Sequence, residues 1–221
     1  MTAVRHPVGE TIANKDGVVL LEPAVEGRGS LMPAFAKAYY EQSGRKACYA
    51  HCAKGATTVC QWQPGTERYE ALVKKARGAI ACLEREDYTV GHRSFVWLQG
   101  ESDAIENTPP GEYIEKMKAL ADKLQEDLSI EYFMIIRVGK FYDFPCEVIM
   151  EAQEQLCRED ERFYMLTRVT STFTVENGLM QDGDWAFHYT NKGYDLVGDI
   201  AGRNAAKYIQ GEAVELEPEA G

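Results

Sequence analysis

The stretch VWLQGESDA, from Val96 to Ala104, places an amide and two carboxylates directly after an apolar run. A core strand has no place for Glu101 and Asp103, and a solvated loop has no need of a tryptophan beside Gln99. A glutamine amide donates hydrogen bonds without titrating, and carboxylates accept hydrogen bonds from backbone N–H groups. The residue types of this junction therefore indicate a functional loop.

Other reactive side chains have simpler explanations. Cys48, His51 and Cys52 are spaced closely, as metal ligands are, but no second Cys/His pair completes a tetrahedral site, so we expect no metal. Six cysteines among 221 residues are too few for a disulfide framework, and several fall in apolar segments. We expect free, buried thiols.

The elements that position these residues alternate along the chain. Apolar runs of strand length occur at 46–52, 93–98, 131–138 and 162–169, and their hydrophobicity is continuous, as in strands covered on both faces. Helical patterning predicts helices at 31–42, 67–85, 110–128, 147–160 and 191–208. Proline suits the first turn of the helix at 110, and Gly44 ends the helix at 31.

Strand–helix alternation predicts an α/β fold in which a parallel sheet carries helices on both faces. In such open sheets the functional site lies at the carboxyl ends of the strands. Three segments follow strands there: AKGATTVCQW, QGESDA and TSTFTVENGLMQDGDWAFHYT. We expect them to converge. One domain over 1–210 accounts for the pattern, and the acidic tail 211–221 is predicted to be disordered.

Charge and hydropathy exclude several classes of function. The formal charge of −11, from 24 Lys+Arg and 35 Asp+Glu, disfavours nucleic acid and anionic membrane surfaces as partners. The basic cluster of Lys74, Lys75 and Arg77 is interpreted as the solvated face of a helix. No apolar run approaches the ~20 residues of a membrane span, and the first residues lack the apolar core of a signal peptide. The sequence as given predicts a cytoplasmic protein, and the alternative is that a signal peptide is lost with a missing N-terminal segment.

The three loop segments resemble blocks of the SGNH (GDSL-type) hydrolase superfamily, in its sialate O-acetylesterase and acetylxylan esterase branch. That branch has a glycine-bearing loop, a W-x-Q-G-E-x-D block and an H-Y-T-x-x-G-x-x-x-x-G block before the final helix. Here these read KGATTVCQW, WLQGESDA and HYTNKGYDLVG, and the similarity runs from about residue 29 to residue 209. The resemblance implies a flavodoxin-like three-layer αβα sandwich and ester hydrolysis without a cofactor.

The resemblance also implies roles for individual residues. His188 resembles the catalytic base, Gly55 a backbone donor to the oxyanion, and Gln99 a side-chain amide donor to the same oxyanion. A serine attacking an acetyl ester needs such an imidazole to take its proton and such donors where negative charge develops. Glu101 and Asp103 are expected to support the loop by accepting backbone hydrogen bonds.

Two departures from the family pattern stand out. The acid that orients the histidine usually lies three positions before it, but Trp185 occupies that position, and the nearest acids are Asp184 and then Asp182. We expect Asp184 to take the role, and a dyad of serine and histidine without an acid is the alternative.

The second departure concerns the nucleophile, because its block, G-Q-S-N or G-D-S, does not occur in the sequence. We therefore expect a domain whose first strand and nucleophile turn are missing.

Ser30 is the only serine with the general setting of a nucleophile, because it follows an apolar run and a glycine-rich turn and opens a helix. An N-cap serine has an ordinary structural role worth ~1 kcal/mol, and we favour that role here.

The sequence thus predicts a carbohydrate O-acetylesterase-type hydrolase, impaired without its nucleophile, that acts on a small-molecule or oligosaccharide acetyl ester. The alternative is a non-catalytic protein of the same fold, either a truncated product or a sugar-binding module. Which sugar carries the acetyl group and the oligomeric state are both left open.

Overall fold

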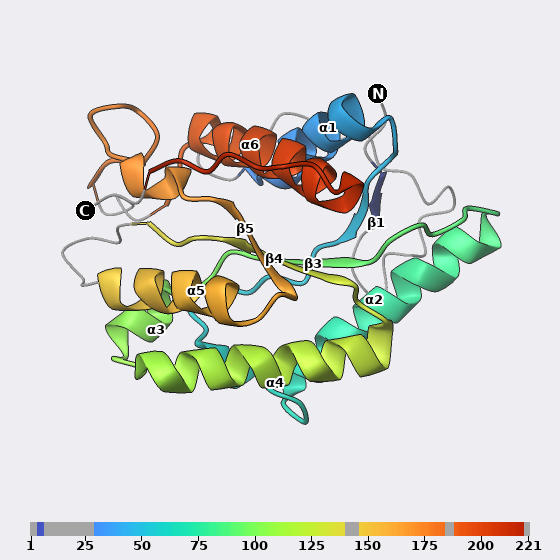
Figure 1. The fold of residues 1–221 in the computed structure, drawn as a ribbon, viewed down its shortest axis with the longest axis horizontal. Coiled ribbons are helices and arrows are strands. Elements are labelled where there is room, and N and C mark those ends of the chain that lie inside the picture. Colours follow the sequence, from blue (N-terminus) through green and yellow to red (C-terminus); the bar gives the residue numbers. More distant parts are fainter. Residues whose placement is uncertain (1–3, 7–28, 140–145, 184–187, 219–221) are drawn as a thin grey trace.

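Helices and strands alternate along the chain (Figure 1). The computed structural model describes residues 4–6, 29–139, 146–183 and 188–218. The strands are β1 Val4–His6, β2 Cys48–Ala50, β3 Ser94–Trp97, β4 Tyr132–Ile136 and β5 Phe163–Thr167. The α-helices are α1 Met32–Ser43, α2 Glu67–Arg85, α3 Glu101–Ile105, α4 Pro110–Leu128, α5 Glu147–Glu159 and α6 Asn191–Gln210. Two short 3₁₀ helices are η2 Val59–Trp62 and η3 Val169–Thr172.

Local signals explain where the long helices begin and end. Thr66 caps α2, because its hydroxyl accepts from the backbone N–H of Tyr69 at 3.2 Å. Thr190 caps α6 in the same way, through the N–H of Gly193 at 3.1 Å. Helix α1 ends at Gly44, whose φ of +69° is readily adopted only by glycine. These local contacts set the ends of the helices.

The strands β3, β4 and β5 form one parallel sheet in that order, with Phe95 opposite Phe133 and Phe133 opposite Phe163. Our expectation that β2 belongs to the same sheet was wrong. Strand β2 instead pairs in parallel with β1 as a separate two-stranded sheet. Among the described residues β2 and β3 are therefore not hydrogen-bonded neighbours.

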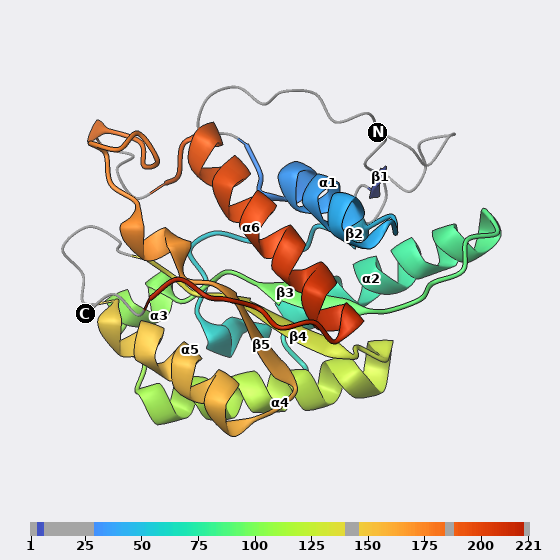
Figure 2. The ribbon, with the colours of Figure 1, turned by 45° about the horizontal axis from the view of Figure 1, so that its top comes forward.

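Alternating side chains of the three-stranded sheet form two cores. Phe133 and Ile135 pack into a cluster with α2, α4 and α5, whereas Met134 and Ile136 pack against α1 and α6. Figures 1 and 2 show these two helical layers on opposite sides of the sheet. The prediction of a three-layer α/β fold with a parallel sheet is confirmed.

Helices α1 and α6 pack so closely that two glycines are required on α6. A Cβ added to Gly198 would lie 2.2 Å from the carbonyl oxygen of Leu31, and one added to Gly202 would lie 2.3 Å from that of Phe35. Real side chains never approach backbone so closely. The second glycine of the HYTNKGYDLVG block, Gly198, therefore has a packing role, since it lets α1 sit directly on α6.

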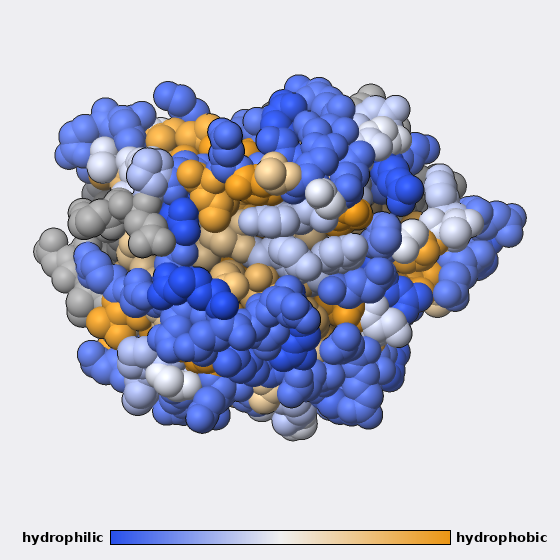
Figure 3. Space-filling model, in the orientation of Figure 1, coloured by the Kyte–Doolittle hydropathy of each residue, from blue (hydrophilic) through white to orange (hydrophobic). Residues whose placement is uncertain are grey.

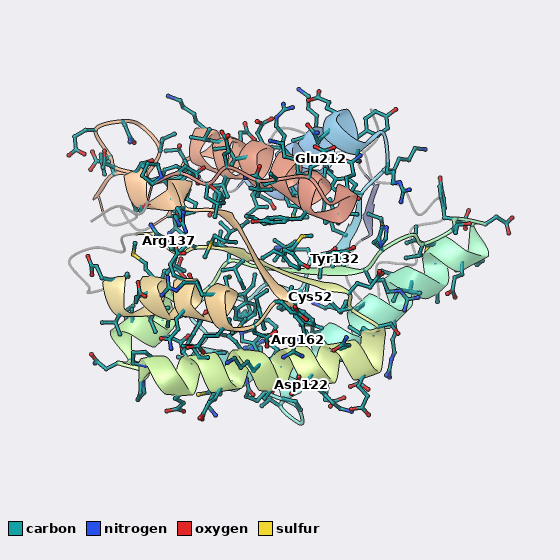
Figure 4. All side chains as sticks on the ribbon, in the orientation of Figure 1. Cys52, Asp122, Tyr132, Arg137, Arg162 and Glu212 are labelled. Carbon is teal, nitrogen blue, oxygen red and sulfur yellow. The ribbon has the colours of Figure 1, made fainter. Side chains whose placement is uncertain are left out.

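The C-terminal tail differs from our expectation of disorder, because residues 212–218 lie across the sheet beside β5 (Figure 2). The Glu217 carboxylate accepts from the Thr167 hydroxyl and from the backbone N–H of Arg168, each at 2.8 Å. Arg168 also pairs with the buried Glu154, which Arg137 contacts from the end of β4 at 2.9 Å (Figure 4). Hydrogen bonds from Thr167 and Arg168 to Glu217 thus hold a tail whose composition alone suggests a solvated chain.

The tail also covers the outer edge of the sheet. Figure 3 shows hydrophilic residues over the two helical layers and paler, more hydrophobic residues in the band between them. Leu216 of the tail packs against the core cluster of α4 and α5. Covering β5 in this way removes an exposed strand edge that could pair with another chain.

Candidate active-site region

The loop that follows β2 is held in a defined conformation. Ala56 has a left-handed φ of +54°, and Thr57, next along the chain, is buried. The Thr57 hydroxyl donates to the Lys54 carbonyl at 2.8 Å and accepts from the Trp62 indole N–H at 3.0 Å. Gly55 is exposed, with open space where a Cβ would lie. The loop thus presents the Gly55 backbone to solvent on a fixed base.

Gln99 and Asp103 tie this loop to the end of β3. The Gln99 amide nitrogen donates to the Thr57 carbonyl at 2.7 Å and to Asp103 Oδ2. The same carboxylate oxygen accepts from the backbone N–H of Val59 at 3.0 Å. Both neighbours of the amide are acceptors, so its NH2 group must face them. We call these four residues the Thr57–Gln99 clamp.

Asp103 carries its charge inside the protein, since its exposed fraction is 0%. Burial raises the pKa of the Asp103 carboxyl above its usual value, and the hydrogen bond from Gln99 opposes that shift. The clamp therefore includes a carboxylate whose removal would leave buried donors without acceptors.

A second buried hydrogen-bond network holds the backbone of Gln99. Its carbonyl accepts from the Tyr113 hydroxyl at 3.1 Å and from the Gln153 amide at 2.8 Å. Gln153 in turn accepts from the backbone N–H of Val138 at 2.9 Å. Gly100 has a φ of +152°, and a Cβ there would lie 2.7 Å from Ile149. The turn after β3 is thus determined by α4, α5 and the end of β4.

Glu101 begins α3 and faces the segment that carries His188. Burial raises the pKa of the Glu101 carboxyl. Burial also raises the pKa of both Tyr189 and Tyr194, and the negative charge of Glu101 raises each of them further. Glu101 therefore lies within electrostatic reach of both tyrosines, which places the QGESDA and HYTNKGYDLVG segments together.

His188 lies three residues before α6, which begins at the end of the sheet where α3 also lies (Figures 1 and 2). Its carbonyl accepts from the backbone N–H of Gln181 at 2.8 Å, and Met180 forms an antiparallel bridge with Tyr189. Partial burial lowers the pKa of the His188 imidazole below its usual value, so the ring is neutral at pH 7. Asp184 and Trp185 lie outside the described residues, so the role of Asp184 stays a prediction.

All six serines of the chain lie in the described residues, and none of their hydroxyls is hydrogen-bonded to the His188 imidazole. Ser30 accepts from the backbone N–H of Met32 at 3.3 Å, but the N-cap of α1 is Leu31, so the expected N-cap role of Ser30 was wrong by one residue. Ser43 donates to the Tyr39 carbonyl at 2.6 Å. Ser171 donates to the Arg168 carbonyl and accepts from Arg137.

Sequence reasoning did not find Thr57, Tyr113 or Gln153 as parts of this region. A glutamine at a buried position of the α5 pattern is the one signal that could have indicated Gln153.

Within the described ranges no three His, Cys, Asp or Glu side chains gather as metal ligands would. Of the helices that the structure describes, none combines the length and the apolar character of a membrane span.

Comparison with known proteins adds independent information. A family model described as "Carbohydrate esterase, sialic acid-specific acetylesterase" matches residues 4–208. The "Probable carbohydrate esterase At4g34215" of Arabidopsis thaliana is 30% identical over 88 residues, which cover 40% of this chain and 32% of that protein. The alignment thus spans about a third of the relative's length.

A solved structure of the protein AT4G34215 from Arabidopsis thaliana is also similar, with a TM-score of 0.65 and 17% sequence identity. The superposition covers 94% of this chain and 82% of that one. At this level of identity the likeness concerns the fold.

Proposed function

The chain belongs to the sialic acid-specific acetylesterase family of carbohydrate esterases, and on that premise we propose that it binds an acetyl ester of a carbohydrate at the carboxyl ends of β2, β3 and β5. The observation that carries the proposal is the hydrogen bond of 2.7 Å from the Gln99 amide to the Thr57 carbonyl. It joins the loop of Gly55 to the QGESDA segment, so the two proposed oxyanion donors share one fixed region.

The proposed chemistry assigns His188 as the base that takes a proton from the attacking hydroxyl. The lowered pKa of its imidazole favours this role, because only the neutral ring accepts a proton. The Gly55 backbone N–H is the proposed first donor to the oxyanion. The Gln99 amide is the second, and to act so it must exchange the Thr57 carbonyl for the oxyanion, since both its N–H groups are engaged. Asp184 is the proposed acid that orients His188.

Turnover further requires a nucleophile. The 221-residue sequence contains no G-Q-S-N block, and Ser43 and Ser171 donate their hydroxyl hydrogens to backbone carbonyls. We therefore propose that this polypeptide binds the ester but hydrolyses it poorly. The second candidate function, a sugar-binding module, shares the binding step. Trp62 and Trp97 are buried, so neither ring is available to stack on a bound sugar.

Binding of an O-acetylated monosaccharide, compared with its deacetylated form, tests the proposal by calorimetry or NMR. We expect the acetylated form to bind more tightly, and His188→Ala and Gln99→Ala to weaken that preference by roughly tenfold each. His92→Ala is the matched control, since His92 lies before β3 at the other end of the sheet and pairs with Glu131 at 3.0 Å. Equal affinity for the two sugars, or equal weakening by His92→Ala, would refute the assignment.

A further inference from the structure

A small pocket lies between the start of the loop after β2 and helix α2. Its volume is about 120 Å³. Cys52, labelled in Figure 4, packs against the core cluster on the α2 and α4 side of the sheet. The lining consists of Cys52, Ala53, Lys54, Trp62, Arg68, Ala71, Leu72 and Lys75.

Three cations converge on this pocket from two elements. Arg68 and Lys75 are seven residues apart on α2, a spacing that places them on one face of the helix, and both are half-buried. Lys54 comes from the loop and is exposed. Within the ranges that the structure describes, none of the three forms an ion pair or hydrogen bond through its side chain.

Neighbouring cations of α2 behave differently. Lys74 is exposed and does not line the pocket, and Arg77 pairs with Asp127 at 3.4 Å. The basic run 74–77, interpreted from the sequence as one solvated face, is therefore divided. Of these three cations, Lys75 alone lines the pocket with Arg68 and Lys54.

None of the described residues that line the pocket is acidic. Like charges gathered around one pocket repel one another, and water screens the half-buried charges of Arg68 and Lys75 less than charges at an open surface. Burial raises the pKa of the Cys52 thiol to about 11, so the thiol is neutral at pH 7 and balances none of the charge. In a protein with a net charge of −11, a local excess of three positive charges needs a separate explanation.

We propose that the pocket of Lys54, Arg68 and Lys75 binds an oxyanion, namely the phosphate or carboxylate group of a small-molecule ligand. Arg68 supplies a planar pair of donors and the lysines supply point charges. Leu72, Ala71 and Ala53 form the apolar part of the wall. The bound anion would also link α2 to the loop that carries Thr57, because the Thr57 hydroxyl donates to the Lys54 carbonyl.

Thermal unfolding of the full chain in inorganic phosphate, acetate and chloride at equal ionic strength tests the proposal. A ligand present at 100 times its Kd is expected to raise the unfolding midpoint by roughly 5–10 °C above the chloride value. The Arg68→Gln/Lys75→Gln variant should lose this shift. The control variant Lys37→Gln/Lys74→Gln removes the same charge from two exposed positions and should keep it.

NMR titration of the wild type locates the site independently of these variants. Phosphate or acetate should shift the amide signals of Ala53 and Ala71 in a saturable manner, and the anion that does so identifies which group the pocket prefers. The proposal is overturned if neither anion exceeds chloride, or if the control variant loses the shift as well. None of these readouts involves His188 or an ester, so their outcome is separate from that of the proposed function.

Discussion

Removal of the Asp103 carboxylate is expected to destabilise the fold through the Thr57–Gln99 clamp. Asp103 Oδ2 accepts from the Gln99 amide and from the Val59 N–H, and the side chain is fully buried. Asp103→Ala leaves two buried donors without acceptors, at about 1–3 kcal/mol each. Partial relaxation brings the expected loss in the free energy of unfolding to roughly 3 kcal/mol, or about 6–12 °C in the unfolding midpoint of a chain this long.

Asp103→Asn separates the hydrogen bonds from the charge. Both donors bind the same oxygen, so an asparagine carbonyl can accept both, and we expect a change in the free energy of unfolding within about 1 kcal/mol of wild type. Urea unfolding of both variants supplies the measurement. If Asp103→Ala is as stable as wild type, or if Asp103→Asn is as unstable as Asp103→Ala, the reasoning fails.

The charge itself predicts a pH dependence. Burial raises the folded-state pKa of Asp103 above its unfolded value, so ionisation weakens the fold at neutral pH. That penalty disappears as the pH falls through the folded pKa toward the unfolded value of about 3.9. Wild type should therefore gain stability relative to Asp103→Asn on acidification over this window, and a relative loss would contradict the assigned direction.

Three further predictions concern packing, titration and the tail. Gly202→Ala should lower the free energy of unfolding in urea by at least ~1–3 kcal/mol, because its Cβ meets a main-chain oxygen of α1. The control Gly111→Ala has open space around the new Cβ and should leave the free energy of unfolding unchanged or raise it by up to ~1 kcal/mol. Equal effects of the two substitutions would contradict the close packing. The His188 imidazole should titrate by NMR below the ordinary value near 6.5 in the folded protein and return to it in urea; a folded midpoint above 6.5 would be inconsistent with its burial. Glu217→Ala should lose roughly 2 kcal/mol through its charged hydrogen bonds, and the exposed control Glu215→Ala close to none; similar losses would show that the tail is not held there.

Much of the secondary structure could be predicted because its signals are local. Helices α2 and α4 have the predicted bounds, since Thr66 caps the first and proline begins the second. Helix α3 was missed because five residues are too few to show a helical period. The pairing of β2 was also missed, since β1 is a three-residue strand and no local pattern states which strand lies beside it.

The candidate site could be predicted as residue types but not as contacts. The sequence indicated that Gln99 and Asp103 belong to a functional loop. Their hydrogen-bond partners Thr57 and Val59, however, lie more than 40 residues away in the sequence. Such contacts depend on the packing of whole elements. Lys75 lines the pocket whereas the neighbouring Lys74 is exposed, because the loop after β2 packs on one face of α2. Helix periodicity alone does not determine which face the loop covers.

Hydrolysis of p-nitrophenyl acetate and of an acetylated sugar by the 221-residue polypeptide tests the central claim most directly. Loss of the serine from a triad removes about 10⁶ in rate, and what remains comes from the oxyanion donors and from binding. We therefore expect little or no turnover, the same in wild type and in Ser30→Ala. Turnover at the usual rates of an esterase, abolished by both Ser30→Ala and His188→Ala, would contradict the account and identify Ser30 as the nucleophile.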